Sequence, residues 1–178
     1  MLNNILKLEK NKCVGCRSCE QVCPVSCIIM KENEEGFFYP DVDSDCTSCG
    51  LCIKKCPILT PIHFAHNTQE SYGMILKDSI LLSKSSSGGV FAGTANYILT
   101  HGGVVFGCAF DDDMNSTHIV ITKSDDLYKL QGSKYVASNT NRTFKIVKEY
   151  VILRKLGFDK PNFFYEKIKE KFYENNKK

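Results

Sequence analysis

The chain has 178 residues, of which 43% are hydrophobic and 24% are charged. These proportions exclude a disordered chain and predict a globular protein of one ordinary domain or two small ones. The net charge is +3, but residues 145–178 carry +5 and the rest carries −2. No nucleic-acid-binding motif accompanies this basic tail, so we expect a solvated lysine-rich helical surface and no nucleic-acid partner.

The N-terminal segment MLNNILKLEK has neither the apolar core nor the small-residue cleavage site of a signal peptide. The sequence also has no apolar run of about 18 residues that could span a membrane. Disulfide bonds form in oxidising compartments. We therefore expect a cytoplasmic protein whose 10 cysteines stay reduced and bind metal.

Two cysteine runs have the same spacing, Cys-x-x-Cys-x-x-Cys-x-x-x-Cys-Pro. They read CVGCRSCEQVCP at residues 13–24 and CTSCGLCIKKCP at residues 46–57. This spacing is typical of bacterial iron–sulfur ligation, in which the fourth cysteine serves the other cluster. Structural zinc is the alternative, but zinc sites usually use two Cys-x-x-Cys pairs well apart in sequence. The spacing favours two [4Fe–4S] clusters.

A cubane cluster needs one thiolate at each of its four iron corners. A tight loop supplies three of them, and the second copy of the loop supplies the fourth. The predicted ligand sets are Cys13, Cys16, Cys19 with Cys56, and Cys46, Cys49, Cys52 with Cys23. Cys27 is an alternative ligand, although eight thiolates already fill two cubanes. Pro24 and Pro57 are each expected to stop a short helix that carries the fourth thiol.

Between the two runs, the sequence predicts a strand at 28–30, a turn at 33–36 and a partner strand at 37–39. Aromatic and aliphatic side chains are expected to pack over the clusters, which must supply much of the stability of so small a domain. Residues 8–60 resemble the two-cluster bacterial ferredoxin family.

A polar linker is expected at 61–70, followed by a strand at 71–76 and a Ser/Gly loop at 84–89. Residues 90–101 are predicted to be a helix that ends at Gly102 and Gly103. Its expected apolar face comprises Phe91, Thr94, Ala95, Ile98 and Leu99.

Further strands are expected at 104–110, 117–123 and 134–138. Asp125 is predicted to cap a short helix that ends at Leu130. A longer helix is expected from Thr140 or Asn141 to Gly157, with Phe144, Val147 and Val151 on one face. Cys108, in the strand expected at 104–110, is expected to be a small buried hydrophobe.

The predicted fold class is α+β, with domains at 1–60 (ferredoxin-like), 71–150 (partial α/β) and 151–178 (a tail of two basic amphipathic helices). The loop KSSSGG precedes a helix N-terminus, where free backbone N–H groups favour phosphate. It matches neither a Walker loop nor a GxGxxG fingerprint, so an ordinary loop and helix cap is the alternative.

The segments KSSSGGVFAGTANYILTHGGVVFGCAFDDD and LQGSKYVAS, which follow the cysteine runs, resemble the family of coenzyme F-420 hydrogenase/dehydrogenase beta subunits. The resemblance covers about residues 8–150. It implies electron transfer between iron–sulfur clusters, a flavin (FAD) and a deazaflavin acceptor, with Ser87, Gly88, Gly89 and Lys134 near the flavin or substrate. An ordinary surface lysine is the alternative for Lys134. Family members continue with a further α/β region, so this chain is interpreted as a truncated member, a split subunit or a frameshifted product.

Three hypotheses follow. The first is an electron-transfer protein or subunit that uses two [4Fe–4S] clusters to exchange electrons with a redox partner. The second adds a flavin and coenzyme F-420, bound in a pocket that another chain completes. The third is a remnant with structural clusters and a partner-binding tail. No catalytic acid, base or nucleophile is assigned, and whether the chain is itself an enzyme stays open.

Overall fold

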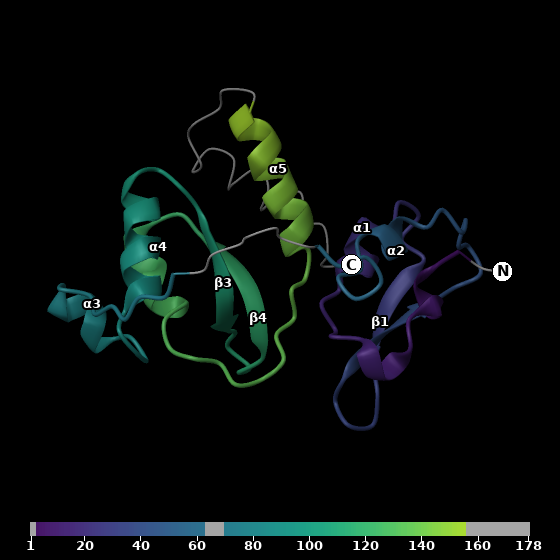
Figure 1. The fold of residues 1–178 in the computed structure, drawn as a ribbon, viewed down its shortest axis with the longest axis horizontal. Helices are drawn as coiled ribbons and strands as arrows, with labels where there is room; N and C mark the ends of the chain where they lie inside the picture. The colour runs from purple at the N-terminus through teal and green to yellow at the C-terminus, as the bar shows by residue number, and fades with distance from the viewer. Residues whose placement is uncertain (1–2, 63–69, 156–178) are drawn as a thin grey trace. The chain divides into compact units, whose positions relative to one another are not determined.

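The computed structural model describes residues 3–62 and 70–155. The chain divides into two compact units, Met1–Gln69 and Glu70–Lys178, coloured purple to blue and teal to yellow in Figure 1. Most of the predicted linker and residues 156–178 of the predicted tail lie outside the described residues. Within the described ranges, no helix is both long and apolar enough to cross a membrane.

The first unit contains an antiparallel β-hairpin of β1 (Ile28–Glu32) and β2 (Phe38–Val42), in which Ile28 pairs with Val42. The Asn33 side chain closes the turn by accepting hydrogen bonds from the backbone N–H groups of Glu35 and Phe37. The predicted strand, turn and strand are therefore confirmed. Both strands extend two or three residues further than the sequence indicated.

Two short helices stand beside this hairpin, α1 (Ser18–Val22) and α2 (Leu51–Lys54). Each carries the third cysteine of its run, Cys19 or Cys52, and ends before the fourth. The expectation that these helices carry the fourth thiol is therefore wrong. Cys23 instead has an extended backbone directly before Pro24, the conformation that a following proline favours. Two 3₁₀ helices, η1 (Ile5–Lys7) and η2 (Lys10–Lys12), precede them and were not predicted.

The second unit is built on an antiparallel hairpin of β3 (Val105–Phe110) and β4 (Ser116–Ile121). Helix α4 (Val90–Thr100) and the 3₁₀ helix η3 (Ser124–Lys129) pack against it around a core of small and branched aliphatic side chains (Figure 1). Helix α3 (Ser79–Ser83), which Asp78 caps, precedes α4, and α5 (Thr143–Lys155) follows η3. The described residues thus mix helices and strands.

Two predicted strands of this unit are wrong. Residues 71–76 and 134–138 belong to no strand. A backbone hydrogen bond from Leu76 N to Gly88 O, at 2.8 Å, connects the first segment to the loop before α4. The second segment is followed by an isolated bridge between Asn139 and Thr117. Among the described residues, neither segment pairs with a strand.

Several local expectations also need correction. The buried face of α4 is Ala92, Ala95 and Leu99, whereas Phe91 is 47% exposed. Thr143 and Ile146 of α5 are buried, whereas Phe144 and Val151, which were expected on its apolar face, are exposed. Asp125 lies in the first turn of η3 but does not cap it. Strand β3, which lies in the segment 104–110 predicted to be a strand, buries Val105 and Ala109 and leaves its other side chains partly or fully exposed.

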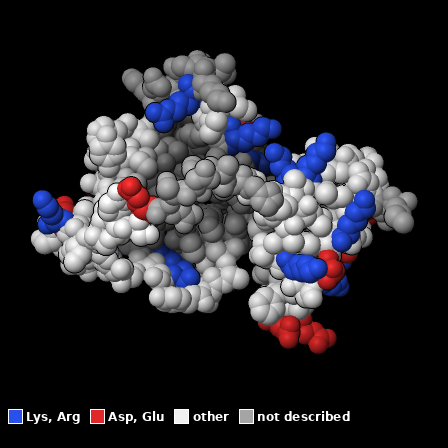
Figure 2. Space-filling model, viewed as in Figure 1, with Lys and Arg blue, Asp and Glu red and all other residues white. Residues whose placement is uncertain are grey.

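Charged residues are mixed on the face shown in Figure 2, where Lys and Arg are spread over the described residues with Asp and Glu among them. The +5 segment lies largely outside the described residues. Its proposed role as a solvated surface, and the expected absence of a nucleic-acid partner, stay predictions.

Candidate iron–sulfur sites and a cavity in the second unit

The two cysteine loops follow the same backbone path. Gly15 and Arg17 flank Cys16 with φ angles of 63° and 60°, and Ser48 and Gly50 flank Cys49 with 54° and 73°. These left-handed conformations are uncommon for residues other than glycine. Their repetition at equivalent positions shows that the internal repeat in the sequence is also a repeat in structure.

Four of the predicted ligands surround one cavity, which we call the first thiol cavity. It is lined by Cys13, Cys16, Cys19 and Cys56, together with apolar side chains that include Ile5, Leu8 and Met30. Cys19 comes from α1, whereas Cys56 comes from the chain beyond α2. Arg17 closes one side, where its guanidinium lies 4.8 Å from the centre of the Phe38 ring and pairs with Glu20.

The other four predicted ligands surround a second cavity, the second thiol cavity. It is lined by Cys23, Cys46, Cys49 and Cys52, and also by Cys27 and Asn4. The structure therefore brings together the residues of each predicted ligand set, including the cysteine that comes from the opposite loop. No local sequence pattern indicates Asn4 as part of this site.

The chemistry of these donor sets fits a cluster. The first cavity is lined by four thiols and the second by five, Cys27 included, and all the cysteines are free of disulfide bonds. Among the described residues, no three His, Cys, Asp or Glu side chains are placed to hold a single metal ion. A cubane cluster requires a different arrangement, because each cysteine thiolate that holds it binds a separate iron.

Burial controls the ionisation of several thiols. It raises the pKa of Cys19 to about 12, and it also raises the pKa of Cys52, which accepts a hydrogen bond from the backbone N–H of Ile5. Iron binds thiolates, so filling these sites must release protons to solvent.

The thiols of the second cavity differ from one another. Burial opposes ionisation of Cys23, but hydrogen bonds from Cys27 and from backbone N–H groups at residues 25–27 lower its pKa. Backbone and side-chain donors at Ser48 and Asn4 lower the pKa of Cys46. Burial raises the pKa of Cys27 itself to about 12. The pKa is thus lowered at Cys23 and Cys46 and raised at Cys27.

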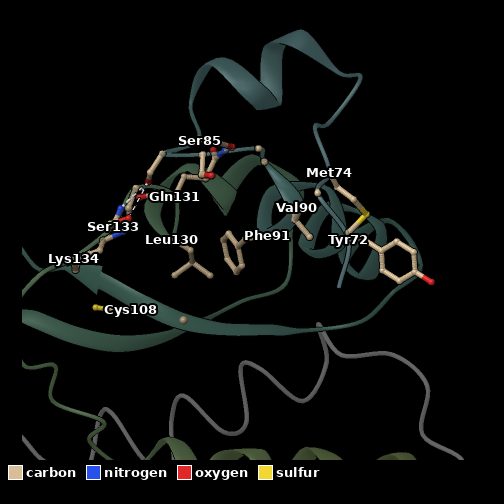
Figure 3. A pocket seen from close by; sticks show the side chains of 17 residues that line it. Tyr72, Met74, Ser85, Val90, Phe91, Cys108, Leu130, Gln131, Ser133 and Lys134 are labelled. Atoms are coloured by element: carbon tan, nitrogen blue, oxygen red, sulfur yellow. Dashed lines mark hydrogen bonds between the residues drawn. The ribbon is translucent and has the colours of Figure 1, made fainter. Parts of the chain in front are cut away.

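The second unit contains a cavity of about 680 Å³, within the usual range for small-molecule sites. Its wall includes residues 72–74, 85–91 and 130–134, and Cys108. Figure 3 shows Phe91 and Leu130 at its centre, Gln131, Ser133 and Lys134 at one end, and Tyr72 and Met74 at the other. The predicted residues Ser87, Gly88, Gly89 and Lys134 therefore all border one space.

Hydrogen bonds between loops shape this cavity. Ser86 Oγ accepts a hydrogen bond from Ser133 N at 3.0 Å and lies 3.2 Å from Ser133 Oγ. Gly88 lies so close to Met74 that a Cβ atom at this position would collide with the Met74 carbonyl oxygen. Gly89 has a φ of 77° and precedes α4 as its N-cap, where it offers no side chain to accept hydrogen bonds from the first N–H groups of the helix.

Lys134 and Cys108 both make polar contacts beside this cavity. The Lys134 ammonium donates hydrogen bonds to the carbonyl oxygens of Lys129, Gln131 and Gly132, and its expected place near a flavin or substrate stays a prediction. Cys108 is only partly buried, and its sulfur lies 3.0 Å from Ser116 Oγ. It borders the cavity rather than filling the core, contrary to expectation.

Residues 12–58 match the 4Fe-4S dicluster domain family. The chain is also similar to an F(420)H(2) dehydrogenase subunit of Methanosarcina mazei, with 22% identity over 142 residues, 73% of this chain and 40% of that protein. Pyruvate synthase subunit PorD of Methanothermobacter marburgensis is 39% identical over 51 residues, 29% of this chain and 54% of that protein. A ferredoxin of Methanocaldococcus jannaschii is 34% identical over 50 residues, 28% of this chain and 65% of that protein.

The chain spans about two fifths to two thirds of the length of these curated relatives. The similarity to PorD and to the ferredoxin is confined to a segment about as long as the dicluster domain, whereas the similarity to the dehydrogenase subunit extends well beyond it. The first unit therefore contains a 4Fe–4S dicluster domain of ferredoxin type, a domain that carries two [4Fe–4S] clusters.

Proposed function

We propose that this chain is an electron-transfer protein or subunit that passes electrons through two [4Fe–4S] clusters to or from a flavin or a coenzyme F-420-type acceptor. The observation that carries the proposal is the division of eight thiols into two cavities of four. In this proposal, one cluster is held by Cys13, Cys16, Cys19 and Cys56. The other cluster is held by Cys46, Cys49, Cys52 and Cys23.

The two short helices give electrons a short path between the sites. Cys19 of one site lies in α1, and Cys23 of the other site directly follows that helix, four residues later. In the opposite direction, Cys52 lies in α2 and Cys56 follows shortly after that helix ends. Four residues span at most about 14 Å, so ligands of the two clusters are near neighbours along the chain.

Anaerobic purification followed by iron, acid-labile sulfide and flavin analysis tests this function. Two clusters require about eight irons and eight sulfides per chain. Reduction with dithionite, followed by visible absorbance and EPR, should bleach the charge-transfer bands and produce signals of reduced clusters. Zinc in place of iron, or clusters that cannot be reduced, would contradict the proposal and favour a structural role.

The cavity of the second unit supports a second part of the proposal, that this unit binds the flavin or deazaflavin. A Ser/Gly loop precedes α4 there, and backbone N–H groups at a helix N-terminus bind phosphate groups well. The apolar centre at Phe91 and Leu130 suits a flat ring system. The similarity to a relative named as an F(420)H(2) dehydrogenase subunit also extends into this unit, since it covers 142 residues.

Titration of the cluster-loaded chain with FAD and with coenzyme F-420, followed by their fluorescence, tests this second part. Gly88→Ala forces Met74 away from the loop, so it should weaken binding at least about tenfold. Ser86→Ala removes the contacts to Ser133 and should weaken binding less. Thr100→Ala, at the other end of α4, is the matched control and should leave binding unchanged. Equal affinity in all four proteins would exclude the cavity as the binding site.

A further inference from the structure

Two polar side chains outside the eight proposed ligands lie against sulfurs of the second thiol cavity. Cys27 Sγ lies 3.4 Å from Cys23 Sγ. Asn4 Nδ2 donates a hydrogen bond to Cys46 Sγ across 3.6 Å. Both residues are only 2% exposed, so solvent does not compete for these donors.

The chemistry of the ligands fixes the direction of both hydrogen bonds. A sulfur that binds iron is a thiolate and has no proton to give. Cys27 must therefore be the donor in its contact with Cys23. Asn4 can only donate to Cys46 through its amide nitrogen, and its other amide atom, Oδ1, is held in place by the N–H of Leu6 at 3.0 Å.

The first thiol cavity lacks the equivalent of Cys27. Cys27 follows Cys23 by four residues, and Thr60 follows Cys56 by the same distance. The Thr60 hydroxyl donates its hydrogen bond to the carbonyl oxygen of Ile53 at 3.0 Å, and the residue is exposed. At the second thiol cavity, a buried donor, Cys27, therefore lies against the fourth ligand, Cys23. At the first thiol cavity, the equivalent side chain, Thr60, donates to a backbone carbonyl oxygen instead.

We propose that Cys27 and Asn4 are positioning residues that raise the reduction potential of the centre held by Cys23, Cys46, Cys49 and Cys52. Hydrogen bonds to the sulfurs set the potential of such centres. Adding one electron increases the negative charge on the ligand sulfurs, so each donor stabilises the reduced form more than the oxidised form. The inference rests on the proposed function, because it requires two bound clusters.

An anaerobic potentiometric titration of the cluster-loaded chain, monitored by EPR, tests the inference. Dithionite supplies one electron to each centre through soluble mediators, and no proton or bond at Cys27 changes. Cys27→Ala removes one donor and should lower one of the two midpoint potentials and leave the other in place. We expect about a three- to tenfold decrease in the equilibrium constant for electron uptake, which is about 30–60 mV.

Two further variants sharpen the result. Asn4→Ser keeps an oxygen that can accept from Leu6 N–H but is too short to reach Cys46, so it should lower the same midpoint potential. Cys27→Ser retains a donor and should shift that potential less than Cys27→Ala. Thr60→Val is the matched control and should shift neither potential.

The possible failures are distinct. If the wild-type chain contains no reducible clusters, the proposed function itself fails. If both clusters form but Cys27→Ala and Asn4→Ser leave both potentials unchanged, or move both equally, the inference is wrong and the proposed function stands. Loss of about half the iron from Cys27→Ala would show that Cys27 is a ligand, which also overturns the inference.

Discussion

The two units differ in what fills their cores. Of the eight buried residues in the core of the first unit, as far as the structure describes it, five are cysteines: Cys19, Cys23, Cys27, Cys52 and Cys56. The corresponding core of the second unit consists of alanine, leucine, valine and isoleucine. A buried thiol packs like a small hydrophobe, but unlike an aliphatic side chain it can also bind iron as a thiolate.

This difference means that stability has separate sources in the two units. The second unit buries enough aliphatic surface around α4 and the β3–β4 hairpin to resemble an ordinary small domain. The first unit has a two-stranded sheet and helices of only a few residues, so it needs its metal to fold stably. Four predictions test this contrast.

Removing iron should have the largest effect. Treatment of the whole chain with a chelator under reducing conditions should unfold residues 3–62 and leave residues 70–155 folded, because only the first core depends on thiolate ligation. Hydrogen–deuterium exchange measured by mass spectrometry should show complete exchange in β1 and β2 and unchanged protection in β3 and β4. Retained protection in β1 and β2 would show that the first unit folds without metal.

A single ligand substitution should have the next largest effect. Cys52→Ala removes a buried thiol from the second thiol cavity and should remove at least about half of the bound iron. Cys108→Ala is the matched control, since Cys108 lies in the second unit and should not change the iron content. Full iron retention in Cys52→Ala would refute its assignment as a ligand.

A core substitution in the second unit should produce the opposite pattern. Leu127 is 1% exposed, so Leu127→Ala should destabilise this unit by about 2–5 kcal/mol and leave the iron content unchanged. Its exposed neighbour Tyr128 is the control, and Tyr128→Ala should change stability by less than about 0.5 kcal/mol. The free energies can be measured from exchange protection in α4. Loss of iron from Leu127→Ala would show that the two units are not independent.

The smallest effect concerns pH. Burial lowers the pKa of His118, whose Nδ1 lies 2.9 Å from Ser138 Oγ, so the folded state favours neutral histidine. This contribution to stability is present above the unfolded pKa of about 6.5 and is lost as the pH falls through the lower folded pKa. His118→Gln should therefore reduce the acid sensitivity of the second unit, whereas His101→Gln, at an exposed residue, should not. Equal acid sensitivity in all three proteins would exclude this role.

The cysteine sites were predictable because ligand spacing carries geometric information. Three thiols at intervals of three residues can surround one cavity only in a tight loop, and the Cys-Pro element sets the position of the fourth. The pairing of Cys56 with the first loop, and of Cys23 with the second, follows from the internal repeat, and the cavities contain these groups. The contact of Asn4 with Cys46 was not predictable, because no local pattern relates residues 42 positions apart.

Several of the errors in the second unit concern residues that border its cavity. Phe91 and Cys108 were expected in the core, and residues 71–76 were expected in a strand, but all of them supply residues that border the cavity. Hydrophobic periodicity identifies apolar side chains without distinguishing those that face a core from those that face a binding space. Predictions from local sequence patterns fail most often where residues form a functional site instead of a packed core.

The repeated left-handed backbone of the cysteine loops has a consequence for how the two copies can diverge. At each equivalent position one copy has glycine and the other has a side chain: Gly15 corresponds to Ser48, and Arg17 corresponds to Gly50. The peptide path is the same in both copies, so the side chains at these points vary without moving the thiols. In the first copy, the Arg17 guanidinium lies over the Phe38 ring. A duplicated loop can in this way present two different outer surfaces to its surroundings while enclosing the same inorganic chemistry.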